Sequence, residues 1–308
     1  MTGHDNTDRK NNRLPPWMKM KLPMGYKYSR VKNLSNKHHL HTICSSGNCP
    51  NIGECWNNGT ATFMILGDVC TRNCKFCAVR TGKPGPVDTG EPRRLAESVR
   101  LLGLDHCVIT SVDRDDLPDG GAGIWAETIR SIKMHNPCTT IEVLIPDFNG
   151  EESLVKMVID ARPEVISHNL ETVKRLTPLI RSKARYETSL EVIKMIASSK
   201  IRSKSGIMLG LGETREEVLE TMDDLLEAGC EVLTIGQYLA PSANHMQVVD
   251  YVKPEQFEEY RETGLQKGFG FVESSPLVRS SYHAEKHAGD RKNKNKPKYA
   301  KESKFSGS

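Results

Sequence analysis

The chain has 308 residues, of which 37% are hydrophobic and 27% are charged, and its formal net charge is +4. This length is enough to bury a sizeable core in one large domain or two ordinary ones. No apolar run approaches the roughly 18 residues that a membrane-spanning helix needs. Residues 1–12 mix acids with bases, which argues against a secretory signal or a transit peptide. The composition therefore predicts a cytoplasmic protein that does not associate with membranes.

Nine cysteines are many for such a chain. A disulfide framework is the usual explanation in secreted proteins, but an odd number of cysteines without an export signal argues against it. Reduced thiols that bind metal are the better explanation for most of them. Three isolated cysteines, Cys107, Cys138 and Cys230, are expected to be small buried hydrophobic residues.

Both ends of the chain are poor in apolar residues. We expect a flexible N-terminus over residues 1–22 and a disordered basic tail over residues 285–308. The tail carries eight lysines or arginines against three acidic residues. It is either a solubilising tail or a surface that attracts an acidic protein partner. Nucleic acid is not an expected partner, because the lysines lack aromatic interleaving.

Between the two ends, short apolar runs alternate with amphipathic stretches. The predicted strands are Thr62–Val69, His106–Ser111, Thr140–Pro146, Glu164–His168, Lys204–Leu209 and Glu231–Gln237. The predicted helices are Glu91–Leu102, Gly123–His135, Glu151–Ala161, Ser189–Ser199, Glu213–Ala228 and Pro254–Lys267. This order predicts parallel βαβ units. It fits an open or partial barrel as well as a doubly wound sheet, and the pattern alone leaves both possible.

The most specific motif is Cys70-Thr-Arg-Asn-Cys74-Lys-Phe-Cys77, which follows the first predicted strand. Three thiolates on one tight loop suit a cubane iron–sulfur cluster in which three irons bind cysteine and the fourth stays open. A structural zinc site needs four closed ligands, usually in closely spaced cysteine pairs. The motif resembles the signature of the radical S-adenosylmethionine (radical SAM) superfamily. That resemblance implies a 4Fe–4S cluster that binds S-adenosylmethionine, and a partial (β/α)6 TIM-type barrel.

A second trio of cysteines lies upstream, in Cys44-Ser-Ser-Gly-Asn-Cys49-Pro-Asn-Ile-Gly-Glu-Cys55. By itself this spacing is only moderately specific, and a zinc knuckle or a reactive thiol cluster would fit it. Together with the string from Cys55-Trp56 to Gly67, it closely resembles the lipoyl synthase family. In that family the upstream trio holds an auxiliary 4Fe–4S cluster that donates sulfur.

The third signal is Arg279-Ser-Ser-Tyr-His-Ala284, near the C-terminus. In the lipoyl synthases this string supplies a serine oxygen as the fourth ligand of the auxiliary cluster, and the corresponding residue here is Ser281. An alkoxide is a harder and weaker ligand for iron than a thiolate. Such a ligand suits a cluster that must release iron and sulfide.

The resemblance also points to residues that contact S-adenosylmethionine. Asn169 and Glu171, after the fourth strand, are expected to face its ribose or methionine part. Gly210 belongs to a glycine-containing motif after the fifth strand, beside the adenine. Arg185 is either a bidentate partner of the methionine carboxylate or an ordinary surface arginine. The charged loop 113–121 lies near cofactor and substrate in the family, without a role that can be assigned per residue.

The resemblance implies a transferase of the sulfurtransferase type. S-adenosylmethionine is cleaved reductively, and sulfur is inserted at carbons 6 and 8 of a protein-bound octanoyl group. The implied partners are octanoylated lipoyl carrier domains, such as the glycine cleavage H protein and the acyltransferase subunits of 2-oxoacid dehydrogenases. An electron donor such as ferredoxin or flavodoxin is also implied. The alternatives are a biotin synthase-like or methylthiotransferase-like enzyme, or a zinc-stabilised binding module.

The same resemblance divides the chain into five parts. They are the flexible N-terminus 1–22, an auxiliary-cluster extension 23–61, the partial barrel 62–270, a segment 271–284 that closes the auxiliary cluster, and the basic tail 285–308.

Overall fold

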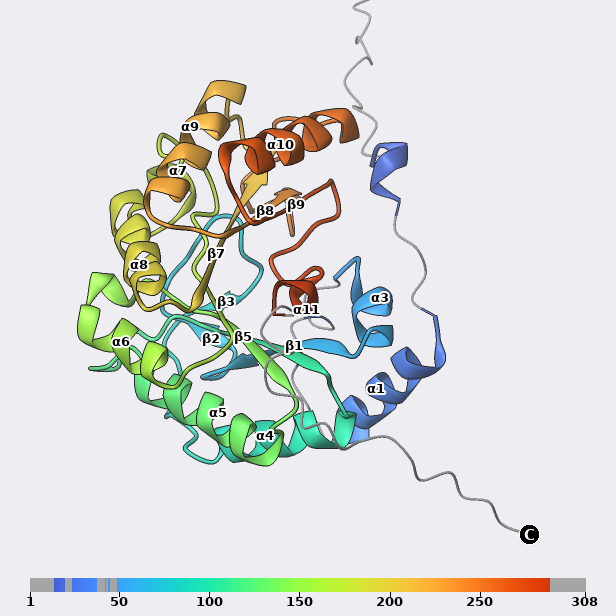
Figure 1. Cartoon of the computed structure of the whole chain (residues 1–308), viewed down its shortest axis with the longest axis vertical. Coiled ribbons are helices and arrows are strands. Elements are labelled where there is room, and N and C mark those ends of the chain that lie inside the picture. Colours follow the sequence, from blue (N-terminus) through green and yellow to red (C-terminus); the bar gives the residue numbers. More distant parts are fainter. Residues whose placement is uncertain (1–13, 20–23, 38–41, 43, 45–48, 289–308) are drawn as a thin grey trace, which may run out of the picture.

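The computed structural model describes residues 14–19, 24–37, 42, 44 and 49–288. Its centre is a parallel sheet of seven strands, drawn in Figure 1. Their bounds are β1 Thr60–Ile65, β4 His106–Ser111, β5 Thr140–Leu144, β6 Val165–Ser167, β7 Arg202–Leu209, β8 Val232–Gln237 and β9 Phe271–Ser274. The strands are rich in buried apolar residues, as expected for parallel strands covered on both faces.

Helices follow the strands and form an arc outside the sheet (Figure 1). They are α4 Glu91–Leu102, α5 Ala122–His135, α6 Glu152–Asp160, α7 Thr177–Ile180, α8 Tyr186–Ser198, α9 Arg215–Glu227 and α10 Pro254–Lys267. Each long helix buries one face, as α9 does with Val218, Met222 and Leu225. A capping box between Thr214 and Glu217 begins α9. The predicted helices are thus confirmed, with shifts of one to three residues at some ends.

The strand order distinguishes the two architectures that the sequence pattern left open. It runs β1-β4-β5-β6-β7-β8-β9, which follows the order along the chain. A doubly wound sheet would reverse its order at a switch point, whereas a barrel adds each new strand to the same edge. The predicted partial (β/α)6 barrel is therefore confirmed, and β9 extends it by a seventh strand that the sequence pattern did not indicate.

The first strand ends earlier than predicted. β1 stops at Ile65, and Leu66 then adopts a positive φ of 67°, which turns the chain out of the sheet. The chain resumes as the short strand β2, Val69–Cys70, which pairs with β3, Arg80–Thr81, in a separate two-stranded sheet. The first cysteine motif is therefore a loop between β2 and β3 and does not continue directly from a barrel strand.

The boundaries of both predicted tails need correction. Residues Pro16–Met18 form the 3-10 helix η1, and Met18 is only 1% exposed, so these residues do not belong to a flexible N-terminus. At the other end, Ala284–His287 form helix α11, and His287 is fully buried. The basic tail therefore does not begin at residue 285. The remainder of the two predicted tails, residues 1–13, 20–22 and 289–308, lies outside the described residues.

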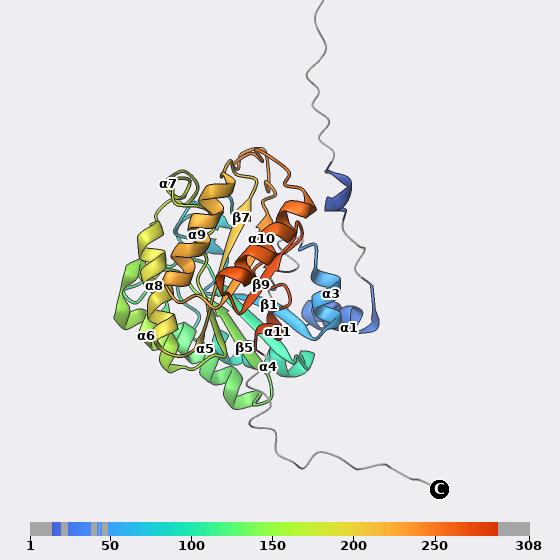
Figure 2. The same ribbon diagram turned by 45° about the horizontal axis from the view of Figure 1, so that its top comes forward.

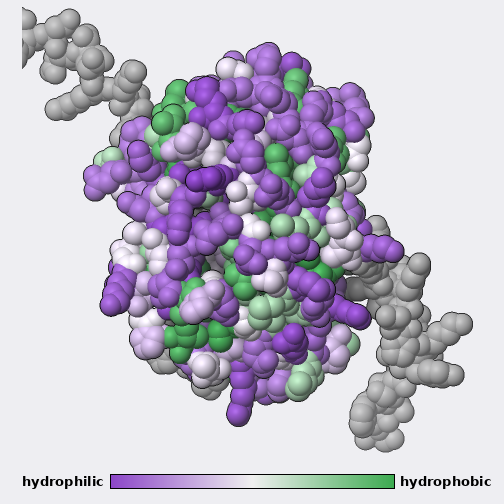
Figure 3. Space-filling view, turned by 90° about the vertical axis from the view of Figure 1, so that its left-hand side faces the viewer, coloured by the Kyte–Doolittle hydropathy of each residue, from purple (hydrophilic) through white to green (hydrophobic). Residues whose placement is uncertain are grey.

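Two N-terminal helices, α1 Tyr26–Lys37 and α3 Ile52–Asn57, pack together beside β1, and Tyr28 stacks on Trp56 at 5.4 Å between ring centroids. Figure 2 shows α11 close to β1, β9 and α3. On the face drawn in Figure 3, hydrophilic side chains dominate and apolar residues form small scattered groups. Among the described residues, no helix is both long and apolar enough to span a membrane.

Candidate metal and cofactor site

The first cysteine trio occupies one compact loop. Cys70 ends β2, and the backbone N–H of Cys77 donates to the carbonyl of Cys74 at 3.1 Å. The sulfur of Cys70 accepts hydrogen bonds from the backbone N–H groups of Arg72, at 3.4 Å, and Asp113, at 3.3 Å. Backbone N–H groups that point at cysteine sulfur stabilise thiolate ligands, so this loop suits an iron–sulfur cluster.

The electrostatics of these thiols fit a cationic centre. Burial raises the pKa of Cys70, and burial together with the neighbouring thiols Cys74 and Cys70 raises the pKa of Cys77 to about 11. A bound cation is what converts such thiols to thiolates. No group of three His, Cys, Asp or Glu side chains among the described residues is arranged to hold a single metal ion. The ligands of a cubane bind different irons, so its thiols need not converge on one point.

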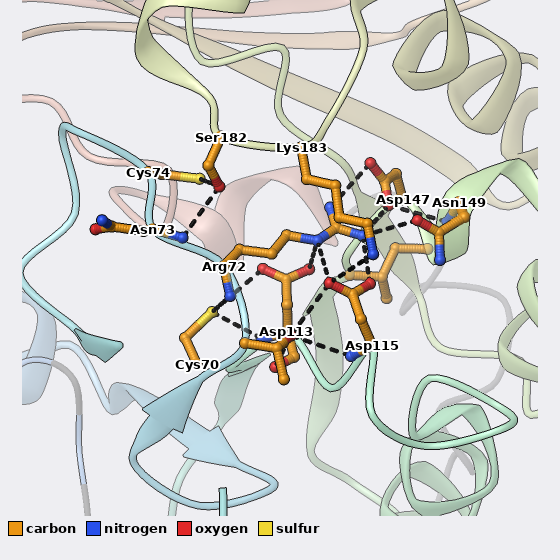
Figure 4. A network of polar contacts seen from close by, with 12 residues as sticks. Cys70, Arg72, Asn73, Cys74, Asp113, Asp115, Asp147, Asn149, Ser182 and Lys183 are labelled. Atoms are coloured by element: carbon orange, nitrogen blue, oxygen red, sulfur yellow. Dashed lines mark hydrogen bonds and ion pairs between the residues drawn. The ribbon is translucent and has the colours of Figure 1, made fainter. Parts of the chain in front are cut away.

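Arg72, inside this loop, is the centre of a buried ionic network (Figure 4). Its guanidinium binds Asp115 through Nε at 3.0 Å and Nη2 at 2.9 Å. It also binds Asp147 through Nη1 at 3.0 Å and Nη2 at 2.7 Å. Asp113 lies 3.4 Å from Nε, and Lys183 lies 3.3 Å from Asp115. The cysteine loop is thereby tied to the residues that follow strands β4 and β5.

This network holds its charges despite burial. Burial opposes ionisation of Arg72, but the hydrogen bonds that it donates to Asp115 and Asp147 outweigh burial and hold the pKa of the guanidinium above its usual range. Burial likewise opposes ionisation of Asp115, and Arg72 overcomes it and lowers the pKa of that carboxyl to about 2. Asp113 differs, because burial raises its pKa and Arg72 compensates only in part. Arg72 is thus the main countercharge for three carboxylates.

We expect Arg72→Ala to destabilise the metal-free protein by about 3 kcal/mol or more, because it strands buried carboxylates without a partner. Urea unfolding of the variant measures this loss. The matched control is Arg80→Ala, which removes an exposed pair with Asp68 whose side chains are 69% and 74% exposed. Because both partners are exposed, that pair should contribute little to the free energy of unfolding. Equal stability of the two variants would contradict the importance of the network.

A cavity lies beside the cysteine loop, at the carboxyl ends of β6, β7 and β8. Fourteen residues line it: Phe76, Asn169, Glu171, Gly206, Ile207, Met208, Thr234, Gly236, Gln237, Tyr238, Leu239, Val278, Arg279 and Ser280. A Cβ atom on Gly206 would meet Thr234 Oγ1 at 2.5 Å and Asn169 Oδ1 at 3.2 Å, so only glycine leaves this space open. Two of the predicted cofactor residues, Asn169 and Glu171, line the cavity.

Glu171 connects the cavity to the cysteine loop. Asn169 Nδ2 donates to Glu171 Oε1 at 3.1 Å, and the charge of Glu171 acts on the thiol of Cys77. Glu171 also has a positive φ of 67°, and its backbone exchanges hydrogen bonds with Gly206 and Met208 of β7. Strained backbone of this kind gathers at functional sites, because the surroundings must enforce it.

The other two predicted cofactor residues lie elsewhere. Gly210 packs against Gln237 and Asp250 and is not among the described residues that line the cavity. Arg185 precedes α8 and is exposed. The buried arginine in this region is Arg181, which donates to Ser189 Oγ at 2.8 Å and to the Leu170 carbonyl at 3.3 Å. The sequence pattern around these two arginines does not indicate which of them is buried.

Behind Asn169, His168 is held in its neutral form. Its Nδ1 donates to the Ile145 carbonyl at 2.9 Å, and its Nε2 lies 3.0 Å from Ser189 Oγ, which already accepts from Arg181. The Ile145 carbonyl can only accept, so Nδ1 carries the proton of the neutral ring, and the unprotonated Nε2 accepts from the serine hydroxyl. Burial, followed by the charge of Arg181, lowers the pKa of His168 to about 4.

We expect this histidine to make stability depend on pH. Because the folded pKa lies below the unfolded value of about 6.5, the stabilisation is present at pH 7 and is lost progressively as pH falls from the unfolded value to the folded one. Between pH 7 and pH 5 the loss should be about 2 kcal/mol. Urea unfolding of the metal-free protein at both pH values measures it. His168→Gln should remove about that much of the pH dependence, and an unchanged dependence would contradict this assignment.

The second cysteine trio lies next to β1 and helix α3. The Cys49 N–H donates to the Cys44 carbonyl at 3.1 Å, and Cys55 lies within α3. Burial raises the pKa of Cys49 and Cys55; the charge of Cys44 raises both further, and the charge of Cys49 also raises the pKa of Cys55. The donor set again fits a polynuclear centre with three thiolates.

The C-terminal string reaches this second trio. The charge of Arg279 acts on the Cys49 thiol, and the charge of Glu285 acts on the Cys55 thiol. Tyr282 and His283, which follow the serine pair, both lie 3.3 Å from Glu54, the neighbour of Cys55 in α3, so the pair lies in the same region. Ser280 lines the cavity described above, whereas Ser281 is not among the described residues that line it.

All nine cysteines belong to the described residues and carry free thiols. Cys107 and Cys230 are buried as predicted, at 0% and 3% exposed. Cys138 is exposed, so the prediction of a buried residue is wrong for it. Its position in the loop that leads from α5 to β5 explains the exposure.

Two family models match the sequence. The model of the radical SAM superfamily matches residues 64–225, and the model of the N-terminal domain of lipoyl synthase matches residues 3–49. The first match spans the strands and helices around the Cys70 loop and the cavity. The second includes Cys44 and Cys49.

Curated relatives match nearly the whole chain. A lipoyl synthase of Bacteroides thetaiotaomicron is 62% identical over 275 residues, which are 89% of this chain and 98% of that protein. A lipoyl synthase of Treponema denticola is 61% identical over 90% of this chain and 96% of its own length. A lipoyl synthase of Porphyromonas gingivalis is 58% identical over 89% and 97%, respectively.

Solved structures share the fold at low sequence identity. Streptococcus suis SuiB bound to precursor peptide SuiA superposes with a TM-score of 0.53 at 13% identity, covering 80% of this chain and 52% of its own. Methylornithine synthase superposes with a TM-score of 0.52 at 11% identity, covering 80% of this chain and 76% of its own. Coproporphyrinogen III oxidase of Escherichia coli, described as a radical SAM enzyme, superposes with a TM-score of 0.51 at 12% identity, covering 68% of this chain and 53% of its own.

Proposed function

Because this chain belongs to the lipoyl synthase family of the radical SAM superfamily, we propose that its two cysteine trios hold two 4Fe–4S clusters with different tasks. Cys70, Cys74 and Cys77 hold the radical SAM cluster. Cys44, Cys49, Cys55 and Ser281 hold the auxiliary cluster. When bound, the first supplies the electron that cleaves S-adenosylmethionine, and the second supplies sulfide to the octanoyl chain at carbons 6 and 8.

The observation that carries this proposal is that the cavity is lined by a residue that interacts with each trio. Glu171 lines the cavity and its charge acts on the Cys77 thiol, and Arg279 also lines it and acts on the Cys49 thiol. A substrate in this cavity would therefore be within reach of both centres. Proximity of this kind is what a radical reaction with two partners requires.

The lining residues divide the cavity by polarity. Asn169, Glu171 and Thr234 offer hydrogen bonds to the hydroxyl and ammonium groups of S-adenosylmethionine. Phe76, Ile207 and Met208 give apolar surface for the adenine or the octanoyl chain. Their other task is to exclude water and other hydrogen donors from the reacting atoms.

The partners follow from this function. The substrate is an octanoyl group on the lysine of a lipoyl carrier domain, of the glycine cleavage H protein or of an acyltransferase subunit of a 2-oxoacid dehydrogenase. A ferredoxin or flavodoxin supplies electrons. We place the protein in the cytoplasm, because free thiols that serve as cluster ligands need a reducing compartment.

Anaerobic reconstitution tests the proposal. The protein should bind about eight irons and eight sulfides per chain, the content of two 4Fe–4S clusters. It should also convert an octanoylated carrier domain to the lipoylated form with release of 5′-deoxyadenosine. A content of four irons with full conversion would contradict the second cluster. A colourless protein with bound zinc would support a zinc-stabilised binding module instead.

A further inference from the structure

The C-terminal segment 275–288 lies between β1 and β9, the two edge strands of the partial barrel (Figures 1 and 2). Its first part lies directly on β8 and α3. The Gln237 N–H donates to the Pro276 carbonyl at 3.2 Å, and Asn51 Nδ2 donates to the Leu277 carbonyl at 2.8 Å. A Cβ atom on Gly236 would lie 2.2 Å from the Val278 carbonyl oxygen, so glycine is required for this close approach.

The middle of the segment connects the two edges. His283 lies 3.2 Å from Glu273 of β9 through Nδ1 and 3.3 Å from Glu54 of α3 through Nε2. Thr60, at the start of β1, donates to Glu285 Oε2 at 3.2 Å. These contacts reach across the gap between the edge strands. Because His283 and Glu54 are partly exposed, their contact contributes only modestly to the stability of the segment.

The end of the segment is anchored far more deeply. His287 is fully buried, and its Nδ1 lies 3.4 Å from Nζ of Lys204, which is itself fully buried. Lys204 also donates to Glu142 at 2.8 Å, and Glu142 is 1% exposed. On the other side of the ring, Nε2 lies 3.8 Å from Glu273 Oε1. Side chains from β5, β7 and β9 thus form a socket for the imidazole inside the barrel.

Two further contacts hold His287 in place, one through its ring and one through its backbone. Its ring packs edge-on against Phe271, with 5.4 Å between ring centroids, and Arg202 donates to the His287 carbonyl. Burial and the charge of Lys204 lower the pKa of His287, so the ring is neutral. Neutral Nδ1 can accept from the ammonium of Lys204, while Nε2–H points toward Glu273. A buried ammonium needs such acceptors, so socket and histidine stabilise each other.

We propose that His287 is a positioning residue, which anchors the C-terminal segment inside the barrel and thereby holds Ser281 against the Cys44, Cys49 and Cys55 trio. This proposal rests on the proposed role of Ser281 as a ligand of the auxiliary cluster. The stretch from residue 278 to residue 287 is fixed at both ends, because Val278 packs against β8 and His287 occupies its socket. The serine therefore cannot withdraw from the trio unless one of these ends is released.

Hydrogen–deuterium exchange of the metal-free, full-length protein tests the anchor itself. In His287→Ala, amides of residues 275–288 should exchange at least tenfold faster than in the parent, while peptides from α5, which lies outside the socket, should stay unchanged. His287→Gln retains a hydrogen-bond acceptor for Lys204 and should recover much of the protection. His135→Ala, at an exposed histidine that ends α5, is the control and should change nothing in this segment. Unchanged exchange in His287→Ala would overturn the anchor.

Iron lability tests the link to Ser281. The background is a variant in which Cys70, Cys74 and Cys77 are all alanine, so that only the second trio binds iron. In this background, His287→Ala should lose iron to a chelator several-fold faster, followed by absorbance and by EPR of the reduced cluster. An unchanged rate with accelerated amide exchange would overturn the positioning role. Ser281→Ala in the same background checks the ligand separately. If it has no effect, the ligand assignment fails, while the exchange experiment still decides the anchor.

Discussion

Replacing Cys74 by alanine is expected to abolish production of 5′-deoxyadenosine. The three thiols of the Cys70 loop have no spare partner, because the fourth iron of such a cluster must stay open for S-adenosylmethionine. Loss of one thiolate therefore removes the site that binds and cleaves the cofactor. We expect turnover to fall by at least about 1000-fold, the scale on which loss of a group essential to the reacting centre acts. The measurement is 5′-deoxyadenosine by chromatography after anaerobic incubation with a reductant.

The same variant should retain the second centre. The two trios lie on separate segments and share no ligand, so Cys74→Ala should keep about four irons per chain, the content of one 4Fe–4S cluster. Cys138→Ala is the matched control, since Cys138 is an exposed cysteine far from both loops in the sequence and should bind the full complement. Normal cofactor cleavage by Cys74→Ala would show that the Cys70 loop is not the radical SAM site.

The sequence predicted the barrel well because its elements are local and strongly patterned. Helices α4 and α10 have the bounds that their amphipathic periodicity predicted, and the apolar runs of β4 and β8 are almost as clear. The strand β9 was missed for the same reason. It is four residues long, and only two of its residues are buried, so it carries too little apolar pattern to be recognised.

The sequence predicted those parts of the site in which the ligands of one metal centre lie close together in the chain. It did not predict the parts that depend on contacts between residues far apart in the sequence. The thiols of each trio lie close in sequence, so their spacing alone indicates a metal centre. Arg72 and Asp147 are 75 residues apart, and nothing local indicates that they form a buried pair. Arg185 was predicted to bind the cofactor, but the buried arginine is Arg181, and burial cannot be read from two arginines four positions apart. Gly210 was predicted to lie beside the cofactor, and only the structure shows that Gly206 is the glycine that keeps the cavity open.

The C-terminal boundary shows how composition can mislead. Residues from 285 onward are basic and poor in apolar groups, which predicts disorder. His287 is nevertheless buried, because Lys204 and Glu142 provide a polar socket that no hydrophobicity pattern can reveal. Removal of residues 285–308 is therefore not expected to be neutral, since it takes away the anchor together with the basic tail.

Ser281→Ala is expected to reduce lipoyl formation by at least about tenfold, the lower end of what loss of a residue that supports a metal centre costs. Cleavage of S-adenosylmethionine should continue, because the Cys70 loop does not depend on that hydroxyl. The measurement compares 5′-deoxyadenosine with lipoylated product, whose ratio should rise in the variant. Ser281→Cys should restore the cluster but slow the release of sulfide, because thiolate binds iron more tightly than alkoxide.

The neighbouring serine provides the control that separates a ligand from a lining residue. Ser280 faces the cavity that contains Asn169 and Glu171, so Ser280→Ala should alter the affinity for cofactor or substrate and leave the iron content unchanged. Ser281 lies between Arg279 and Glu285, whose charges act on Cys49 and Cys55, so its loss should be felt at the second trio. If Ser280→Ala lost auxiliary iron while Ser281→Ala turned over normally, the ligand would be Ser280. The chain would then have to present the first serine of the pair to the trio and turn the second away.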